Sequence, residues 1–173
     1  MGKATREAYG NALARIGKEN TNIIVLDADL SKSTKTDTFK GACPERFFNV
    51  GIAEQNLISV GAGLAAAGKN PFVSSFAMFA TGRAFEQIRN AVCYPKLNVK
   101  VCATHAGITV GEDGATHQSL EDISCMRTLP NMTVVVPADE RETEAVVEWA
   151  ASYEGPVYVR LGRAGVDDVT AEG

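Results

Sequence analysis

Cysteine motifs, long apolar runs and an excess of positive charge are all missing from this sequence of 173 residues. The four cysteines, Cys43, Cys93, Cys102 and Cys125, show no CxxC spacing, so we expect free thiols rather than disulfides or a cysteine metal site. No stretch is long enough to span a bilayer, and the first residues, MGKATREAYGN, contain no apolar signal-peptide core. We therefore expect a cytoplasmic protein.

The charge balance argues against a nucleic-acid-binding module. The chain has 17 lysines and arginines against 21 acidic residues, which gives a net charge of −4 and a pI near 5.2. Such a chain lacks the basic field that attracts nucleic acid or an anionic membrane. The hydrophobic fraction of 45% and the charged fraction of 22% are those of an ordinary globular protein. The length fits one domain.

Helical and strand patterns alternate along the sequence, which predicts a three-layer α/β/α fold with a mainly parallel sheet. Short apolar runs predict strands at 22–26, 47–50, 71–74, 99–103, 133–136 and 157–161. Apolar residues near helical spacing predict helices at 5–18, 53–67, 77–92, 120–128 and 140–152. Gly68 is expected to cap the second of these helices at its carboxyl end.

The glycines of VGAGLAA at 60–66 satisfy the pattern GxGxxA, which outlines a dinucleotide-binding fingerprint. That fingerprint requires a strand before the glycines and a helix that begins at them. Here the glycines lie inside a helical pattern that began about two turns earlier. Small residues that let a helix pack closely on a sheet explain the pattern better, and we reject nucleotide binding there.

Titratable residues gather at two places in the sequence. Glu54, in FNVGIAEQN, follows a strand-like run and begins a helix, where a carboxylate commonly complements the helix dipole. His105 and His117, the two histidines, frame the Gly-rich segment THAGITVGEDGATHQ together with Glu112 and Asp113. Loops that follow strands are where α/β folds place their sites, and the histidine spacing fits no standard zinc pattern. The residues alone predict a site built from Glu54 and this loop, without a bound metal.

Four motifs in consistent order, GIAEQN, SSFAMFA, GEDGATHQSLEDIS and LPNMTVVVPAD, resemble the pyrimidine-binding domain of the transketolase family. The resemblance extends from Thr5 to Arg163. It implies a thiamine-diphosphate-binding fold of the pyrimidine-binding type over residues 1–173, and an enzyme of the pentose phosphate pathway that transfers a two-carbon ketol unit between sugar phosphates. The diphosphate-binding domain, through which Mg²⁺ or Ca²⁺ is bound, and the family's C-terminal domain would lie outside this chain.

The resemblance assigns Glu54 to the cofactor. In family terms its carboxyl group hydrogen-bonds N1′ of the aminopyrimidine ring of thiamine diphosphate. A proton donated at N1′ favours the imino tautomer at the 4′ position, whose nitrogen then removes the proton from thiazolium C2. Glu54 must therefore hold a proton at neutral pH, which a partly apolar pocket favours by disfavouring the carboxylate.

Three further residues are assigned to cofactor binding. Phe76 and Phe79 are three positions apart and are expected to share a helix face, a spacing that by itself is more typical of a core. In family terms Phe79 stacks on the aminopyrimidine and Phe76 forms a further pocket wall. Asp29, in DADLSKS, matches an aspartate near the thiazolium. Gly82 departs from the pattern, because many transketolases carry an aromatic residue there, beside the pyrimidine pocket.

The resemblance also implies roles on the substrate side. Asp113 would bind a substrate hydroxyl and His117 would lie beside the reacting carbon, so that both join Glu54 and His105 as catalytic residues. The substrate phosphate would be held by a set of hydrogen-bond donors suited to a dianion: Arg6, Ser33, His105 and Arg163. Arg160, three positions earlier, is an alternative to Arg163.

Related enzymes and a different class of function remain as alternatives. Deoxyxylulose-phosphate synthase shares a similar loop, but Glu112 before Asp113 and the histidine at position 105 look more like transketolase. The β subunit of 2-oxo-acid dehydrogenases is similar in fold and lacks the GEDGATHQ pattern. A non-catalytic α/β binding or regulatory module would explain the incomplete length but not the presence of every site residue. We expect part of the C-terminal subunit of a split transketolase, inactive without its diphosphate-binding partner, and a homodimer.

Overall fold

Six short strands form a single sheet in the computed structural model, which describes residues 2–171. The strands are β1 (Ile23–Asp27), β2 (Phe47–Asn49), β3 (Asn70–Phe76), β4 (Lys100–Thr104), β5 (Thr133–Val135) and β6 (Val157–Arg160). They lie in the order β2-β1-β3-β4-β6-β5, and each neighbouring pair is parallel. Parallel neighbours require crossover connections, which the helices provide. The predicted α/β fold with a parallel sheet is confirmed.

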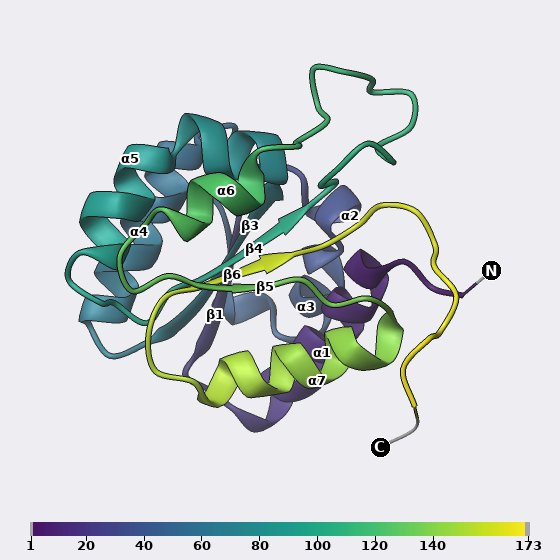
Figure 1. Cartoon of the computed structure of the whole chain (residues 1–173). Coiled ribbons are helices and arrows are strands. Elements are labelled where there is room, and N and C mark those ends of the chain that lie inside the picture. Colours follow the sequence, from purple (N-terminus) through teal and green to yellow (C-terminus); the bar gives the residue numbers. More distant parts are fainter. Residues whose placement is uncertain (1, 172–173) are drawn as a thin grey trace.

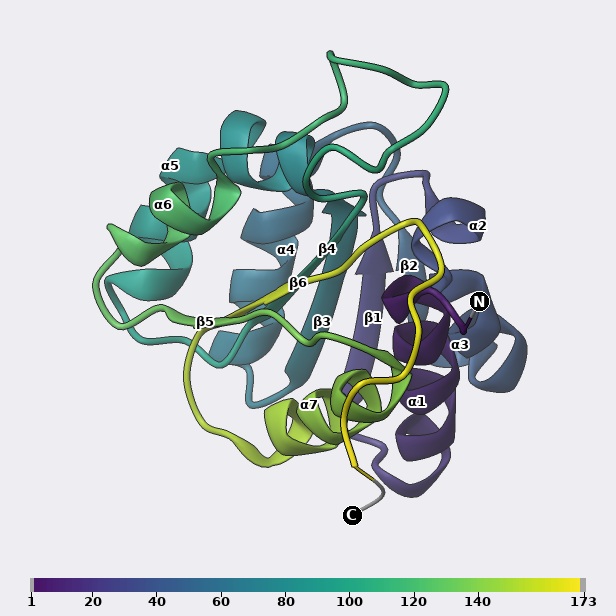
Figure 2. The same ribbon diagram turned by 45° about the vertical axis from the view of Figure 1, so that its right-hand side comes forward.

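Helices cover both faces of this sheet (Figures 1 and 2). One layer contains α1 (Thr5–Glu19), α3 (Thr36–Ala42) and α7 (Glu140–Ser152), with the short α2 (Ser31–Thr34) beside α3. The other contains α4 (Glu54–Ala66), η2 (Phe79–Arg83), α5 (Phe85–Gln87), η3 (Ile88–Cys93) and α6 (Asp122–Arg127). A short 3₁₀ turn, η1 (Pro44–Arg46), leads into β2. Across residues 2–171, no helix is both long and apolar enough to cross a membrane.

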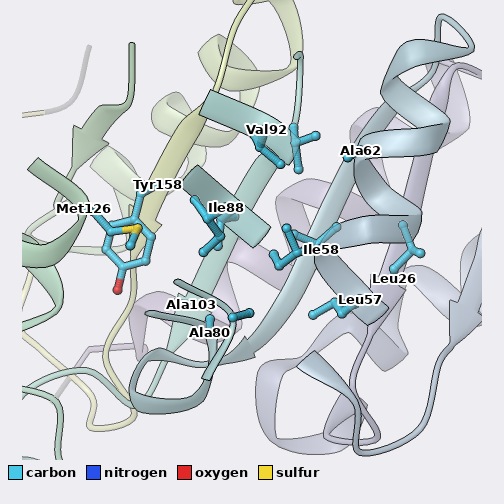
Figure 3. Close-up of a cluster of buried hydrophobic side chains, with 14 of the residues drawn as sticks. Leu26, Leu57, Ile58, Ala62, Ala80, Ile88, Val92, Ala103, Met126 and Tyr158 are labelled. Atoms are coloured by element: carbon cyan, nitrogen blue, oxygen red, sulfur yellow. The ribbon is translucent and has the colours of Figure 1, made fainter. Parts of the chain in front are cut away.

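The strands alternate their side chains between two apolar cores, one on each face. In β1, Ile23 and Val25 pack with α1, α3 and α7, whereas Ile24 and Leu26 pack with the opposite helical layer. A strand that is buried on both faces has a continuous run of apolar residues, as β1 has in the sequence. Figure 3 shows part of the second core, where side chains of α4, η3 and α6 meet the sheet. Cys43, Cys93 and Cys102 are buried, Cys125 is partly buried, and all four are free thiols, as expected.

The segment predicted as one helix at 77–92 is the main departure from the sequence-based prediction. Phe76 is the last residue of β3 rather than a helical residue, and most of the segment forms the π-helices η2 and η3 on either side of α5. The buried residues Ala80, Ala84, Ile88 and Val92 recur every four positions. An α-helix has about 3.6 residues per turn, so a more widely wound helix keeps this row on one face. An apolar pattern alone does not distinguish the two windings.

Two short helices, α2 and α3, were missing from the prediction, which assigned no element between β1 and β2. The buried carboxylate of Asp27 organises this segment. It accepts hydrogen bonds from the Leu30 backbone N–H at 2.6 Å and from the Thr34 and Thr36 hydroxyls at 2.6 and 2.8 Å. Burial raises the pKa of Asp27, and these donors act against that rise. Helices held by such tertiary contacts leave little periodic signal in the sequence.

Candidate active site

The candidate residues lie at the carboxyl edge of the parallel sheet. Asp29 follows β1, Glu54 is the first residue of α4 after β2, and Phe76 ends β3. His105 follows β4, and Arg163 follows β6. This is the edge at which open α/β domains bind their ligands. The topology therefore brings together residues that are far apart in the sequence.

Two phenylalanines and two histidines form an aromatic cluster at this edge. The rings of Phe76 and His105 are stacked, with centroids 3.8 Å apart. Phe76 and Phe79 are stacked at 5.8 Å, and His117 meets the Phe79 ring edge-on at 5.2 Å. Both ends of the Gly-rich loop are thus placed against the end of β3. The expected proximity of Phe76 and Phe79 is confirmed, although a strand end and η2 provide it rather than one helix.

Glu54 is buried, with 1% of its surface exposed. Its Oε2 accepts a 2.6 Å hydrogen bond from Nη1 of Arg83, and the Ser75 hydroxyl donates to Oε1 at 3.5 Å. The Arg83 guanidinium also lies over the Phe79 ring, 4.8 Å from its centroid. The sequence-based prediction missed Arg83. The available signal was its position four residues after Phe79, which places two residues on the same side of a helix.

His105 lies in a buried and positively charged environment. Its Nδ1 is 2.8 Å from the hydroxyl oxygen of Thr104. Burial, and next the positive charges of Arg6 and Arg163, lower the pKa of His105 to about 4, while Asp113 acts in the opposite direction. The imidazole is therefore neutral at pH 7 and carries one N–H donor.

Asp29 and His105 share an unusual backbone conformation. Their φ angles are 64° and 61°, in the left-handed region that residues other than glycine seldom adopt. Each lies just beyond the end of a strand, and the Asp29 carboxylate accepts a 2.7 Å hydrogen bond from Nδ2 of Asn49. Such conformations cluster at functional sites, where the surrounding structure compensates for their cost.

The predicted phosphate-binding residues form a second group of side chains at this edge. Arg6 donates from Nη1 to the backbone carbonyl of Ser33 at 2.9 Å, so Ser33 contacts it through its main chain. Nε of Arg6 is buried without a hydrogen-bond partner among residues 2–171. Burial, followed by the positive charge of Arg163, lowers the pKa of Arg6. Two close cations and an unused donor are features of an anion-binding site.

Arg163 and Arg160 have different partners. Nη2 of Arg163 donates to Oε1 of the exposed Glu112 at 3.0 Å. Nε of Arg160 donates to the fully buried carboxylate of Asp122 at 2.8 Å, and the Tyr158 hydroxyl donates to the same oxygen at 2.8 Å. Arg160 is therefore part of an internal polar cluster. This arrangement favours Arg163 as the arginine of the candidate site.

The Gly-rich loop after β4 projects beyond the sheet edge (Figures 1 and 2). Asp113 is exposed on it, and His117 is partly buried, with Nδ1 2.9 Å from the Thr116 hydroxyl oxygen. Gly111 has a φ of 90°, and a Cβ atom there would lie 2.3 Å from Nη1 of Arg163. Glycine at this position lets the loop approach the Arg163 guanidinium.

The fold and the site define a class of protein: a parallel α/β domain with a buried carboxylate, aromatic rings and a group of arginines at one sheet edge. Residues 1–167 match the family model described as "Transketolase, pyrimidine binding domain". The chain belongs to this transketolase family. The resemblance carried by the four sequence motifs is thereby confirmed.

Known relatives agree with this assignment. The chain is 60% identical over 161 residues to a putative transketolase C-terminal section from Methanocaldococcus jannaschii, covering 93% of this chain and 51% of that protein. It is 44% identical to the transketolase of Homo sapiens, covering 92% of this chain and 26% of that protein. A solved structure described as a split gene transketolase, inactive beta4 tetramer, superimposes with a TM-score of 0.89 at 64% identity, covering 99% of this chain and 55% of that one. The chain thus spans about half the length of two of these relatives and a quarter of the third.

Proposed function

We propose that this chain supplies the pyrimidine-binding part of a transketolase active site that uses thiamine diphosphate to transfer a two-carbon ketol unit between sugar phosphates. One observation carries the proposal beyond family membership. The buried Glu54 carboxylate and the Phe79 ring both contact one planar cationic group, the Arg83 guanidinium. Glu54 and Phe79 are therefore placed so that a flat hydrogen-bond donor can contact the carboxylate with its edge and the aromatic ring with its face.

An aminopyrimidine ring fits the same two contacts. It is planar, stacks on an aromatic face, and has a ring nitrogen that shares a proton with a carboxyl group. The guanidinium stands in for the protonated form of such a ring, because it is also flat and donates N–H groups from its edge. The residues at the site therefore suit the pyrimidine half of thiamine diphosphate, the cofactor that membership in this family implies.

Each residue of this half has a distinct task in the proposal. Glu54 holds a proton against N1′ of the ring, and burial strengthens that hydrogen bond by excluding water. Phe79 stacks on the ring, while Phe76 and Asp29 form neighbouring parts of the pocket. When bound, thiamine diphosphate supplies a nucleophilic thiazolium carbon that accepts the two-carbon unit.

The substrate is oriented by the second group of side chains. Arg6 and Arg163, with Ser33 and a neutral His105, bind the phosphate of the sugar, and the unused Nε of Arg6 supports this assignment. Asp113 accepts a hydrogen bond from a sugar hydroxyl, and His117 lies beside the reacting carbon. The low pKa of His105, about 4, keeps it an N–H donor without a third positive charge.

The remaining half of the active site belongs to a diphosphate-binding domain or subunit, which holds the diphosphate through Mg²⁺ or Ca²⁺. Alone, this chain is expected to be inactive and to bind thiamine diphosphate weakly, because most of the cofactor's charge lacks a partner. Calorimetric titration with cofactor and magnesium checks this, and tight binding by this chain alone would contradict it. We also propose a homodimer or larger assembly, which sedimentation tests; a strict monomer at high concentration argues against it.

Reconstitution tests the function itself. The chain is mixed with a diphosphate-binding transketolase subunit, thiamine diphosphate and magnesium, and ketol transfer from a ketose phosphate to an aldose phosphate is followed. Activity that depends on both proteins and on Glu54 supports the proposal. Cofactor-independent binding of another ligand, without ketol transfer, would instead favour a non-catalytic module.

A further inference from the structure

Arg83 makes both of the contacts that the proposed function assigns to the pyrimidine ring. Its Nη1 is 2.6 Å from Oε2 of Glu54, and its guanidinium carbon is 4.8 Å from the centroid of Phe79. Glu54 is almost completely buried, whereas 49% of the Arg83 side chain is exposed. The carboxylate is therefore fixed in the fold, and its partner reaches it from the solvent side.

The backbone of η2 carries this arrangement. Phe79 and Arg83 are the first and last residues of this π-helix. Such one-turn widenings are frequent at functional sites. Gly82 is exposed, has no side chain with which to wall the pocket, and a Cβ atom there would meet only Cε of Met78 at 3.2 Å. The face of the Phe79 ring is instead covered by the guanidinium of Arg83, the residue after Gly82.

The ion pair with Arg83 stabilises the buried Glu54 carboxylate while no cofactor is bound. A buried carboxylate that lacks a partner is strongly unfavourable. Besides the bond from Arg83, the Glu54 carboxylate accepts a hydrogen bond from the Ser75 hydroxyl at the long distance of 3.5 Å. An arginine satisfies the carboxylate well, since its planar fork donates from the edge while its face lies on an aromatic ring.

The same pairing opposes the proposed task of Glu54. Arginine does not give up its proton in proteins, so a Glu54 carboxylate bound to Arg83 has no proton to share with N1′. Two flat groups also cannot lie on the same face of Phe79 and against the same carboxylate oxygen. Binding of the pyrimidine ring therefore requires the Arg83 guanidinium to move away. Because this side chain is half exposed, it can move into solvent without disturbing the core.

We propose that Arg83 is an internal occupant of the pyrimidine site, which holds Glu54 while the site lacks its cofactor and must withdraw before the ring binds. This inference rests on the proposed function and adds a residue that sets the affinity for the aminopyrimidine. A site that is competent only when Arg83 is displaced has an apparent affinity lowered by the fraction of molecules that are open. Removing the occupant removes that penalty.

The test measures affinity for the pyrimidine half alone, with 4-amino-5-hydroxymethyl-2-methylpyrimidine as the probe. Its dissociation constant is determined by NMR titration of the chain, for wild type and for Arg83→Gln. We expect Arg83→Gln to bind the probe about three- to tenfold more tightly, because the shorter, neutral amide removes the charge that holds the Glu54 carboxylate. Arg83→Lys, which keeps the charge but loses the planar fork, is expected to lie between the two.

Two further variants make the outcomes distinct. Arg89→Gln is the matched control. Arg89 is an exposed arginine of η3 that donates a hydrogen bond to the neighbouring Asn90, and its replacement should leave the affinity unchanged. Glu54→Gln should weaken binding of the probe both in the wild-type background and in the Arg83→Gln background. If Glu54→Gln weakens binding but Arg83→Gln leaves it equal or weaker than wild type, Arg83 is no competitor and the inference is wrong. If no variant binds, or Glu54→Gln has no effect, the proposed pyrimidine site itself is overturned, and the inference with it.

Discussion

Glu54 and Asp122 are both buried carboxylates that begin a helix on the same face of the sheet, and each is paired with an arginine. Asp122 receives the Arg160 guanidinium and the Tyr158 hydroxyl, and Arg160 is only 22% exposed. The arginine partner of Glu54, Arg83, is 49% exposed and lies over the Phe79 ring, and the Ser75 hydroxyl donates to Glu54 only at the long distance of 3.5 Å. The internal pair ties α6 to β6, whereas the pair at the sheet edge has a partner that reaches it from the solvent side and that we propose a ligand replaces. Burial alone therefore does not distinguish the two carboxylates; the exposure of the arginine partner does.

The largest expected effect concerns Glu54 in the reconstituted enzyme. Glu54→Gln should lower turnover by about 100-fold or more, because an amide touches N1′ without shifting a proton to it. Phosphate binding through Arg6, Ser33, His105 and Arg163 should change little, so the half-saturation for substrate stays near that of wild type. Hydrogen–deuterium exchange at C2 of the cofactor isolates the step. Equal exchange rates in wild type and Glu54→Gln would reduce Glu54 to a helix-terminal carboxylate.

Asp122 should give the opposite result. Asp122→Ala leaves Arg160 without its counter-ion in a largely buried position, which is expected to lower the free energy of unfolding by about 3 kcal/mol. Urea unfolding of the isolated chain measures this change, with Glu54→Gln as the matched control, expected within about 1 kcal/mol of wild type. The comparison fails if Asp122→Ala is as stable as wild type, or if Glu54→Gln is the more destabilised variant.

His105 extends the comparison to a buried group close to two arginines. Its pKa of about 4 lies below the ordinary value of 6.5, so the unfolded chain binds a proton between these values while the folded chain does not. Folding stability should therefore fall as the pH decreases from about 6.5 to 4, by at most about 3 kcal/mol from this residue and less where solvent screens it. Urea unfolding across this window in wild type and His105→Gln measures the contribution. A pH dependence that is identical in the two proteins would contradict the assignment.

The smallest expected effect is at the exposed pair of Glu112 and Arg163, whose side chains are 82% and 31% exposed. Exposed ion pairs contribute little, so Glu112→Gln should free Arg163 and tighten substrate phosphate binding only about twofold. The half-saturation of the reconstituted enzyme for a sugar phosphate measures this change. Glu148→Gln, which breaks the exposed pair with Arg15 away from the site, is the control. Weaker binding in Glu112→Gln would mean that Glu112 positions Arg163 rather than competing for it.

Much of the fold could be predicted from the sequence because the central strands β1, β3 and β4 are buried on both faces. Continuous apolar runs such as 23–26 and alternating helices leave few arrangements other than a parallel sheet covered on both sides. The segment 77–92 was correctly predicted to be helical, but its π-helical winding could not be predicted. An apolar row with a spacing of four is compatible with more than one winding, and packing against the sheet selects among them.

The sequence by itself determined the family and the sheet and indicated the residues of the candidate site, because Glu54, the phenylalanines and the histidine loop lie in recognisable motifs. Only the tertiary structure decided the partners of those residues. Arg83 and Arg163, like Arg160, are single basic residues in the sequence, and nothing local distinguishes a ligand-binding arginine from one that holds an internal carboxylate. The distinction depends on which strand ends lie side by side and on how much solvent reaches each guanidinium, and both are properties of the packed sheet rather than of any segment.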